Sequence, residues 1–141
     1  MKILECSSKG DKRFSAFYAM VSIDNVNKSI ENHYQECKRV NGKVINNGKG
    51  VNPDYIFIRG KALDKKYLTP YYKLLWVKYL DKNKDLVEYL KQYDDFTDMF
   101  KTKNTINCQA DVIRQYIKLG RESIINEDIV KEFISIIGEL T

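Results

Sequence analysis

The ten residues YYKLLWVKYL, at positions 71–80, are apolar around almost the whole circumference of a helix. Thr69 and Pro70 precede them, a pair typical of a helix start, with threonine as the N-cap and proline at the first helical position. A helix that is hydrophobic on all sides has to be covered on all sides. The run therefore predicts a central helix around which the rest of the chain packs.

Three later segments also show apolar residues at helical spacing. These residues are Leu86, Leu90 and Tyr93 in the first segment, Ala110, Ile113 and Ile117 in the second, and Ile129, Phe133, Ile136 and Leu140 in the third. Gly120 is expected to end the second helix, and Asn126 to cap the third. Between them, DDFTDMFK at 94–101 predicts a short helix or turn whose rings and methionine point inward.

The first sixty residues are less helical in character. KILEC at 2–6 and YIFIR at 55–59 predict short strands, and residues 13–23 predict a strand or extended chain. Residues 41–54 are dense in Asn, Gly and Pro and predict a long loop that could hold a small hairpin. We expect an α+β fold, predominantly α-helical, with a few short N-terminal strands in one domain spanning residues 1–141.

Composition excludes several classes of protein. The chain has 43% hydrophobic and 30% charged residues, which is typical of a globular protein and too apolar for a disordered one. No run approaches the length of a membrane span, and the N-terminus lacks the apolar core of a secretory signal, so we expect a cytoplasmic protein. The net charge of +5 comes from scattered basic residues, which permits a phosphate-bearing ligand without requiring one.

Cysteine and histidine are too few for a metal site. The three cysteines are far apart in the sequence, and His33 is the only histidine. We expect buried, reduced thiols, a structural or solvated His33, and neither a metal ion nor a cofactor.

A helix over about 29–40, capped by Ser29 and stopped by Gly42, contains the most suggestive segment, SIENHYQECK. It carries two stripes, one polar with Glu31, Gln35 and Lys38, and one apolar with Ile30, Tyr34 and Cys37. At 3.6 residues per turn the polar stripe spans roughly 60° and lies at the edge of the apolar stripe. It is either the solvated flank of an ordinary helix or the wall of a site.

Other candidate residues each have an ordinary structural explanation as well. Phe14, Phe17 and Tyr18 are either core rings or rings that stack on a base. Asp95 and Asp98, with Asp94, are either a carboxylate group for acid–base chemistry or residues that cap a helix. Asn107 belongs to a polar stretch with Gln109, Asp111 and Arg114 that could reach a ligand, which is a weak signal by itself.

Two segments together resemble the NADAR family of YbiA-like N-glycosidases, named for NAD and ADP-ribose. RFSAFY at 13–18 is similar to the family's FSNF-type segment, and SIENHYQECK matches the spacing of its Glu, Gln and Lys. Downstream, LLWVKYLDKNKDLVEYL at 74–90 resembles the family's helix pair. The order of these pieces covers residues 13–118, and the chain is identified as a divergent member with a NADAR-like single domain.

The resemblance implies an N-glycosidase-like hydrolase acting on ADP-ribose-linked or ribosylated-base substrates, for example removing ADP-ribose from guanine in nucleic acid. It implies Glu31 as the catalytic carboxylate, with Asp95 or Asp98 as a second one. The implied ligand-binding residues are Arg13, Phe14, Phe17, Tyr18, Gln35, Lys38, Trp76 and Asn107.

The residues leave open whether the chain hydrolyses its ligand. The alternative is a non-catalytic protein that binds or sequesters a nucleotide such as an ADP-ribose derivative, in a viral or defence-related setting. In either case the expected partner is a small-molecule nucleotide or ADP-ribosylated nucleic acid and not a membrane. No feature of the sequence indicates an oligomeric state.

Overall fold

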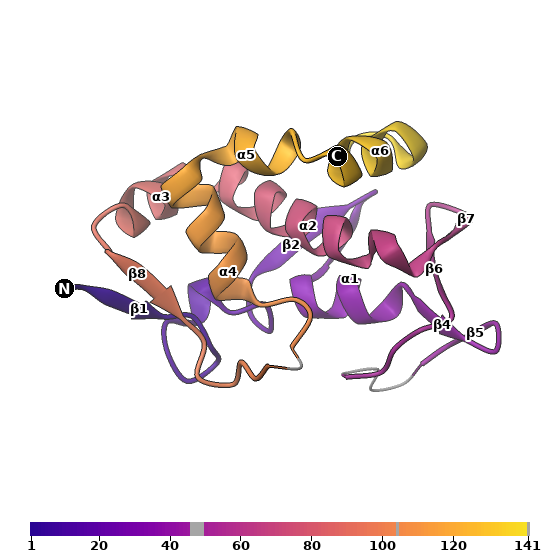
Figure 1. The fold of residues 1–141 in the computed structure, drawn as a ribbon, viewed down its shortest axis with the longest axis horizontal. Helices are drawn as coiled ribbons and strands as arrows, with labels where there is room; N and C mark the ends of the chain where they lie inside the picture. Colours follow the sequence, from indigo (N-terminus) through magenta and orange to yellow (C-terminus); the bar gives the residue numbers. More distant parts are fainter. Residues whose placement is uncertain (46–49, 104, 141) are drawn as a thin grey trace.

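The computed structural model describes residues 1–45, 50–103 and 105–140. Helix α2 (Leu68–Lys82) runs through the middle of the molecule, and ten of its fifteen residues are buried, among them Leu75, Trp76 and Leu80 at 0% exposure (Figure 1). The predicted central helix is thus confirmed.

The start of α2 differs from the prediction. A short 3₁₀ turn, η2 (Lys65–Tyr67), is capped by the Asp64 side chain and continues directly into the helix. Thr69 therefore lies inside α2 and is not its N-cap, and Pro70 is the third helical residue. Proline is tolerated there because the first-turn N–H groups have no partner within the helix.

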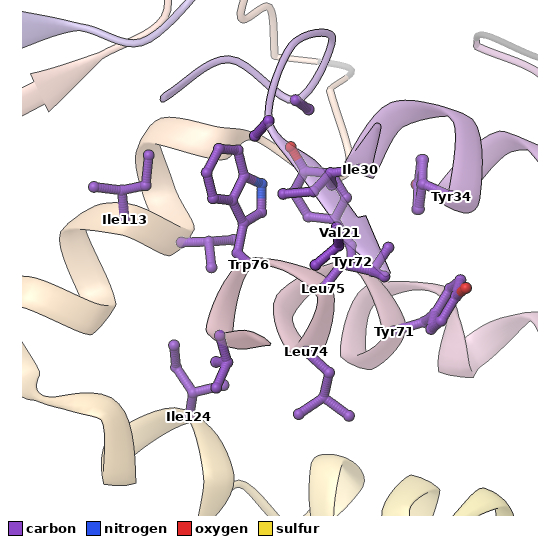
Figure 2. Packing of buried hydrophobic residues seen from close by; sticks show 14 of the residues in the cluster. Val21, Ile30, Tyr34, Tyr71, Tyr72, Leu74, Leu75, Trp76, Ile113 and Ile124 are labelled. Carbon is purple, nitrogen blue, oxygen red and sulfur yellow. The ribbon is translucent and has the colours of Figure 1, made fainter. Parts of the chain in front are cut away.

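Elements pack on both sides of α2 (Figure 1). One side is covered by the hairpin of β2 (Met20–Ile23) and β3 (Val26–Ser29) and by α1 (Ile30–Glu36), and the other by α5 (Arg121–Ile125) and α6 (Asp128–Ile137). Helix α3 (Lys84–Leu90) follows α2. Helix α4 (Gln109–Arg114) packs against α2 and continues as a π-helical turn, η3 (Gln115–Leu119). Figure 2 shows Ile30, Val21, Tyr72 and Trp76 on one side of α2, and Leu74 with Ile124 on the other.

The segment expected to be a helix or turn over 94–101 contains a strand instead. β8 (Asp95–Thr97) pairs in parallel with β1 (Ile3–Glu5), with Leu4 opposite Phe96. Phe96 is buried as expected, but Met99 and Phe100 are 63% and 54% exposed. The local pattern could not reveal this, because the partner strand lies about ninety residues earlier in the chain. The predicted strand at 2–6 is confirmed as β1.

The helix expected over 29–40 ends at Glu36. Its N-cap is Ser29 as predicted, but Lys38–Val40 forms strand β4, which pairs with β6 (Tyr55–Ile58). The antiparallel sheet has the order β5-β4-β6-β7, with β5 at Lys43–Val44 and β7 at Lys61–Leu63. Asn41 and Gly42, both at positive φ, form the turn of the β4–β5 hairpin. Part of the segment predicted as loop, residues 46–49, lies outside the described residues.

Helix α6 buries a different face from the one expected. Its N-cap is Glu127 instead of Asn126, and its buried residues are Val130, Phe133 and Ile137. Ile129 is exposed, and Ile136 is only half-buried. The two faces share Phe133 and both are rich in isoleucine, so spacing alone could not choose between them.

The whole forms a mixed α+β fold in which helices predominate. Within residues 1–45, 50–103 and 105–140, no helix is both long and apolar enough to cross a membrane.

Candidate functional site

The start of α1 is fixed to the segment that carries the exposed aromatic rings. Ser29 caps the helix by accepting a hydrogen bond from the Asn32 backbone N–H at 3.0 Å. The backbone N–H of Glu31 donates to the Ala16 carbonyl at 2.9 Å, and that of Ile30 to the Ala19 carbonyl. The RFSAFY segment and the first turn of α1 are therefore held side by side.

Glu31 and Gln35 form the pair that their spacing predicts. Gln35 Nε2 donates to Glu31 Oε1 at 2.9 Å, and the Glu31 side chain is half-buried. Glu31 forms no ion pair with any described residue. Gln35 Oε1 is buried and has no hydrogen-bond partner in the described part of the chain, which is a costly state for a polar atom.

Lys38 is near this pair but not on the same helical stripe. It belongs to β4, is 3% exposed, and its ammonium donates to the Val51 carbonyl at 3.2 Å and lies 5.0 Å from the Tyr34 ring centre. Burial lowers the pKa of Lys38, while the neighbouring Cys37 and Glu31 act in the opposite direction. The prediction of one three-residue helical stripe is therefore wrong, because the helix ends before Lys38.

Asn107 reaches α1 through Tyr34. Its side-chain amide donates to the Tyr34 hydroxyl at 2.7 Å, joining the segment before α4 to α1. Burial raises the pKa of Tyr34 to about 12, although the hydrogen bond from Asn107 lowers it. The phenol is therefore protonated at neutral pH, and its neutral oxygen accepts the hydrogen bond from Asn107.

Gln109 is a connecting residue, whereas the sequence indicated only that it belongs to a polar stretch that could reach a ligand. Its side chain is buried; Oε1 accepts from the Ala16 backbone N–H at 2.7 Å, and Nε2 donates to Asp98 Oδ2 at 2.7 Å. Together with the bond from Glu31 to Ala16, these contacts join Asp98, α4, the aromatic segment and α1. The only sequence signal is a polar residue beside Ala110, on the face of α4 that packs inward.

The aromatic candidates divide into exposed and buried rings. Phe17 and Tyr18 are 46% and 50% exposed, with Lys12 Nζ lying 4.9 Å from the Tyr18 ring centre. Phe14 and Trp76 are 0% exposed, and Phe14 stacks on Tyr89. Because a ligand cannot reach the faces of buried rings, Phe14 and Trp76 are core residues in this structure, whereas Phe17 and Tyr18 are accessible.

Arg13 and Asp95 are held in ion pairs that no described contact links to Glu31. Arg13 bonds to Asp11 and lies over the Tyr89 ring, 4.5 Å from its centre. Asp95 accepts from Arg114 Nε at 2.7 Å, and this hydrogen bond is the main reason that the pKa of Asp95 is lowered. Asp98, by contrast, is linked to Glu31 through Gln109 and Ala16.

The single histidine and the three cysteines are buried residues of the fold. His33 is buried with Nε2 2.8 Å from the Val21 carbonyl, and all three cysteines are buried and free. Among the described residues, no group of three or more His, Cys, Asp or Glu side chains is placed to hold a metal ion. The chemistry available around Glu31 is that of its carboxylate, the adjacent Gln35 amide and the accessible rings of the neighbouring segment.

Comparisons with known proteins identify the family. The model of the DarT1-associated NADAR antitoxin family, NADAR-DarT1, matches residues 43–140, which is more than half of the chain. The matched region contains Trp76, Asp95, Asp98 and Asn107, whereas Glu31 and the aromatic segment precede it. No curated protein matches the chain. Both the family match and the motifs quoted above point the same way, and the chain belongs to the NADAR family.

Proposed function

We propose that this protein is an N-glycosidase-like hydrolase that acts on an ADP-ribose-linked base, such as guanine carrying ADP-ribose in nucleic acid. The observation that carries the proposal is Glu31, a half-buried carboxylate without a cationic partner among the described residues, on a helix whose first turn is hydrogen-bonded to the segment that carries two accessible aromatic rings. The family match supports the ADP-ribose part of the proposal.

The residues around Glu31 suit the cleavage of a carbon–nitrogen glycosidic bond. Such cleavage passes through an oxocarbenium-like state, and a carboxylate beside the anomeric carbon stabilises its positive charge. An ion-paired carboxylate would do this less well, because its charge is already neutralised by its partner. Glu31 also could polarise the attacking water or hold ribose hydroxyls.

The neighbouring groups take supporting roles in this proposal. Gln35 holds one Glu31 oxygen at 2.9 Å, and a ribose hydroxyl that donated to Gln35 Oε1 would satisfy that unpartnered atom. Phe17 or Tyr18 would stack on the leaving base. Lys38 places a positive charge near Glu31, where it favours a phosphate-bearing ligand.

The description of the family supplies a biological setting. It names an antitoxin associated with DarT1. For this chain we accordingly propose that the hydrolysis removes a modification that a partner toxin has placed on nucleic acid.

A second candidate function is binding without hydrolysis. It is favoured by two observations, of which the first is that the family match begins at residue 43 and leaves Glu31 outside it. In addition, Asp98, which was expected to be a possible second carboxylate, already accepts hydrogen bonds at both oxygens. The protein would then sequester or sense an ADP-ribose derivative.

One experiment separates the two candidates. The wild-type protein is incubated with an oligonucleotide that carries ADP-ribosyl-guanine, and released ADP-ribose is measured by chromatography, with ADP-ribose binding measured separately by calorimetry. Release of ADP-ribose with restoration of the unmodified oligonucleotide establishes hydrolysis. Binding without release over a long incubation supports the second candidate, and the absence of both rejects the site.

A further inference from the structure

A groove lies between α2 and the C-terminal helices, away from Glu31. Its volume is about 480 Å³, within the range of about 300–1,000 Å³ that is typical of small-molecule sites. The lining residues come from α2, α5, α6 and the segment after α6. They are Leu74, Val77, Lys78, Asp81, Lys82, Arg121, Ile125, Ile134, Glu139 and Leu140.

The groove and the Glu31 site are on opposite sides of α2. Figure 2 shows Tyr72 and Trp76 pointing to the side of Ile30. Leu74 points away from Ile30, to the side of α2 where Ile124 of α5 lies. A ligand in the groove would therefore not share contacts with one at Glu31.

The interior of the groove is aliphatic. Leu74 and Val77 lie on α2, Ile125 and Ile134 face them from α5 and α6, and Leu140 belongs to the chain after α6. Each methylene that such a surface removes from water makes binding more favourable. The groove therefore favours a ligand with an apolar body.

Two ammonium groups at the groove have no carboxylate partner among the described residues. Lys78 is 8% exposed, and its ammonium donates to the Ser22 carbonyl of β2. Lys82 follows one helical turn later, and neither lysine forms an ion pair with a described residue. Burial lowers the pKa of Lys78, and the charge of Lys82 lowers it further. A bound anion would relieve the repulsion between these two cations.

The carboxylate of Asp81, which also lines the groove, does not neutralise the lysines. Its Oδ1 accepts from the Tyr116 hydroxyl at 2.6 Å, and its Oδ2 from Arg121 Nε at 2.8 Å. Tyr116 lies in the π-helical turn η3, a form of helix that is rare and often found at functional sites. The turn thus helps to hold Arg121 at the rim through Asp81, leaving Glu139 as the one exposed, unpaired carboxylate among the groove residues.

We propose that this groove binds a small amphipathic anion, namely a carboxylate with an apolar body of several carbon atoms. The aliphatic residues hold the body, Lys82 binds the carboxylate, and the nearby positive charge of Lys78 adds to the attraction. This site is independent of the proposed hydrolase function.

The test is calorimetric titration of the full chain with octanoate, butyrate and the neutral octanamide. Octanoate is expected to bind at least about tenfold more tightly than octanamide, since hydrogen bonds to charged groups are roughly twice as strong as neutral ones. Butyrate should bind more weakly than octanoate, because each lost methylene removes burial.

Substitutions test whether octanoate binds in the groove. Lys82→Met should reduce octanoate affinity about tenfold and leave octanamide affinity unchanged, whereas Lys84→Met, on α3 outside the groove, should leave both unchanged. Lys78→Met serves as a second variant, with circular dichroism to verify folding. Glu31→Gln should bind octanoate like the wild type.

Three results would overturn the proposal. These are the absence of octanoate binding at millimolar concentration, equal affinity for octanoate and octanamide, and equal loss of octanoate binding in Lys82→Met and Lys84→Met. The last would indicate general attraction to a basic surface.

Discussion

Two carboxylate-bearing regions of this protein differ in what their oxygens already bind. In the segment 94–98, Asp94 accepts from the Lys2 backbone, Asp95 from Arg114, and Asp98 from both Phe100 and Gln109. In α1, the side chain of Glu31 accepts one hydrogen bond from the described part of the chain, donated by the Gln35 amide. The acidic segment is the denser cluster in the sequence, but its carboxylates tie β8 and the following loop to the rest of the fold. In the proposed function, this difference leaves Glu31 to act on the ligand.

The difference shows that counting carboxylates is a poor guide to a site. A carboxylate that accepts a hydrogen bond from an arginine or a backbone N–H has a structural role, because those donors already stabilise its negative charge in the ground state. The more informative property is a partly buried carboxylate without a cation, since its field is available to a developing positive charge.

The largest expected effect is that of Glu31→Gln on turnover. We expect kcat to fall by at least about 10²–10³, the usual loss when one electrostatic stabiliser of a transition state is removed. ADP-ribose affinity should change little, because the amide keeps the size of the side chain. Asp95→Asn is the matched control, and an equal loss of turnover in both variants would remove the distinction between the two regions.

The next effect concerns Gln109, which joins the two regions. Gln109→Leu removes one donor from Asp98 Oδ2 and leaves the buried Ala16 N–H without a partner, and an unsatisfied buried group costs about 1–3 kcal/mol of unfolding free energy. Urea denaturation measures the loss, with the exposed Gln92→Leu as control. Equal stability of Gln109→Leu and the wild type would mean that the connection is not maintained in solution.

A smaller effect is expected at the exposed rings. Phe17→Ala should weaken binding of an ADP-ribosylated oligonucleotide by about 1–3 kcal/mol, the usual contribution of one ring stacked on a base, with little change in stability. Phe57→Ala removes another partly exposed ring, which lies beneath Arg39 in the sheet, and should leave binding unchanged. Calorimetry measures the binding of the oligonucleotide, and equal losses of affinity in the two variants would argue against stacking at Phe17.

The smallest effect is on stability in acid. Hydrogen bonds from Arg114, Arg13 and Arg59 lower the pKa values of Asp95, Asp11 and Asp24 below the ordinary 3.8. These pairs stabilise the fold while the aspartates are ionised, and the contribution is lost as pH falls below about 4 through the lowered pKa values. Because the pairs are largely exposed, each loss should be small. Thermal unfolding between pH 6 and 2 measures it, and Asp95→Asn should show a weaker dependence.

The sequence predicted best what depends on local pattern. The central helix, the Ser29 cap, the strands at 2–6 and 55–59, and the Glu31–Gln35 contact all follow from spacing and composition within a few residues. The strand at Asp95–Thr97 was missed because its partner, Ile3–Glu5, is distant in the sequence. Lys38 was misplaced for a similar reason, since its partner in the sheet is Ile56 of β6, eighteen residues later.

Burial of rings was equally hard to predict from the sequence. Phe14 and Phe17 belong to one hexapeptide, yet the first is fully buried and the second almost half exposed. Their difference is set by Tyr89, which stacks on Phe14 from an element over seventy residues away. Gln109 likewise becomes important only when Ala16 and Asp98 meet it in the fold.

A structure with ADP-ribose bound would test most directly whether Glu31, and not the acidic segment, is the reactive carboxylate. We predict that the anomeric carbon lies about 3–3.5 Å from a Glu31 carboxylate oxygen, the distance of a reactive geometry, with Phe17 or Tyr18 beside the leaving-group position. ADP-ribose bound instead at Asp95 and Asp98, with Glu31 turned toward bulk solvent, would contradict the account.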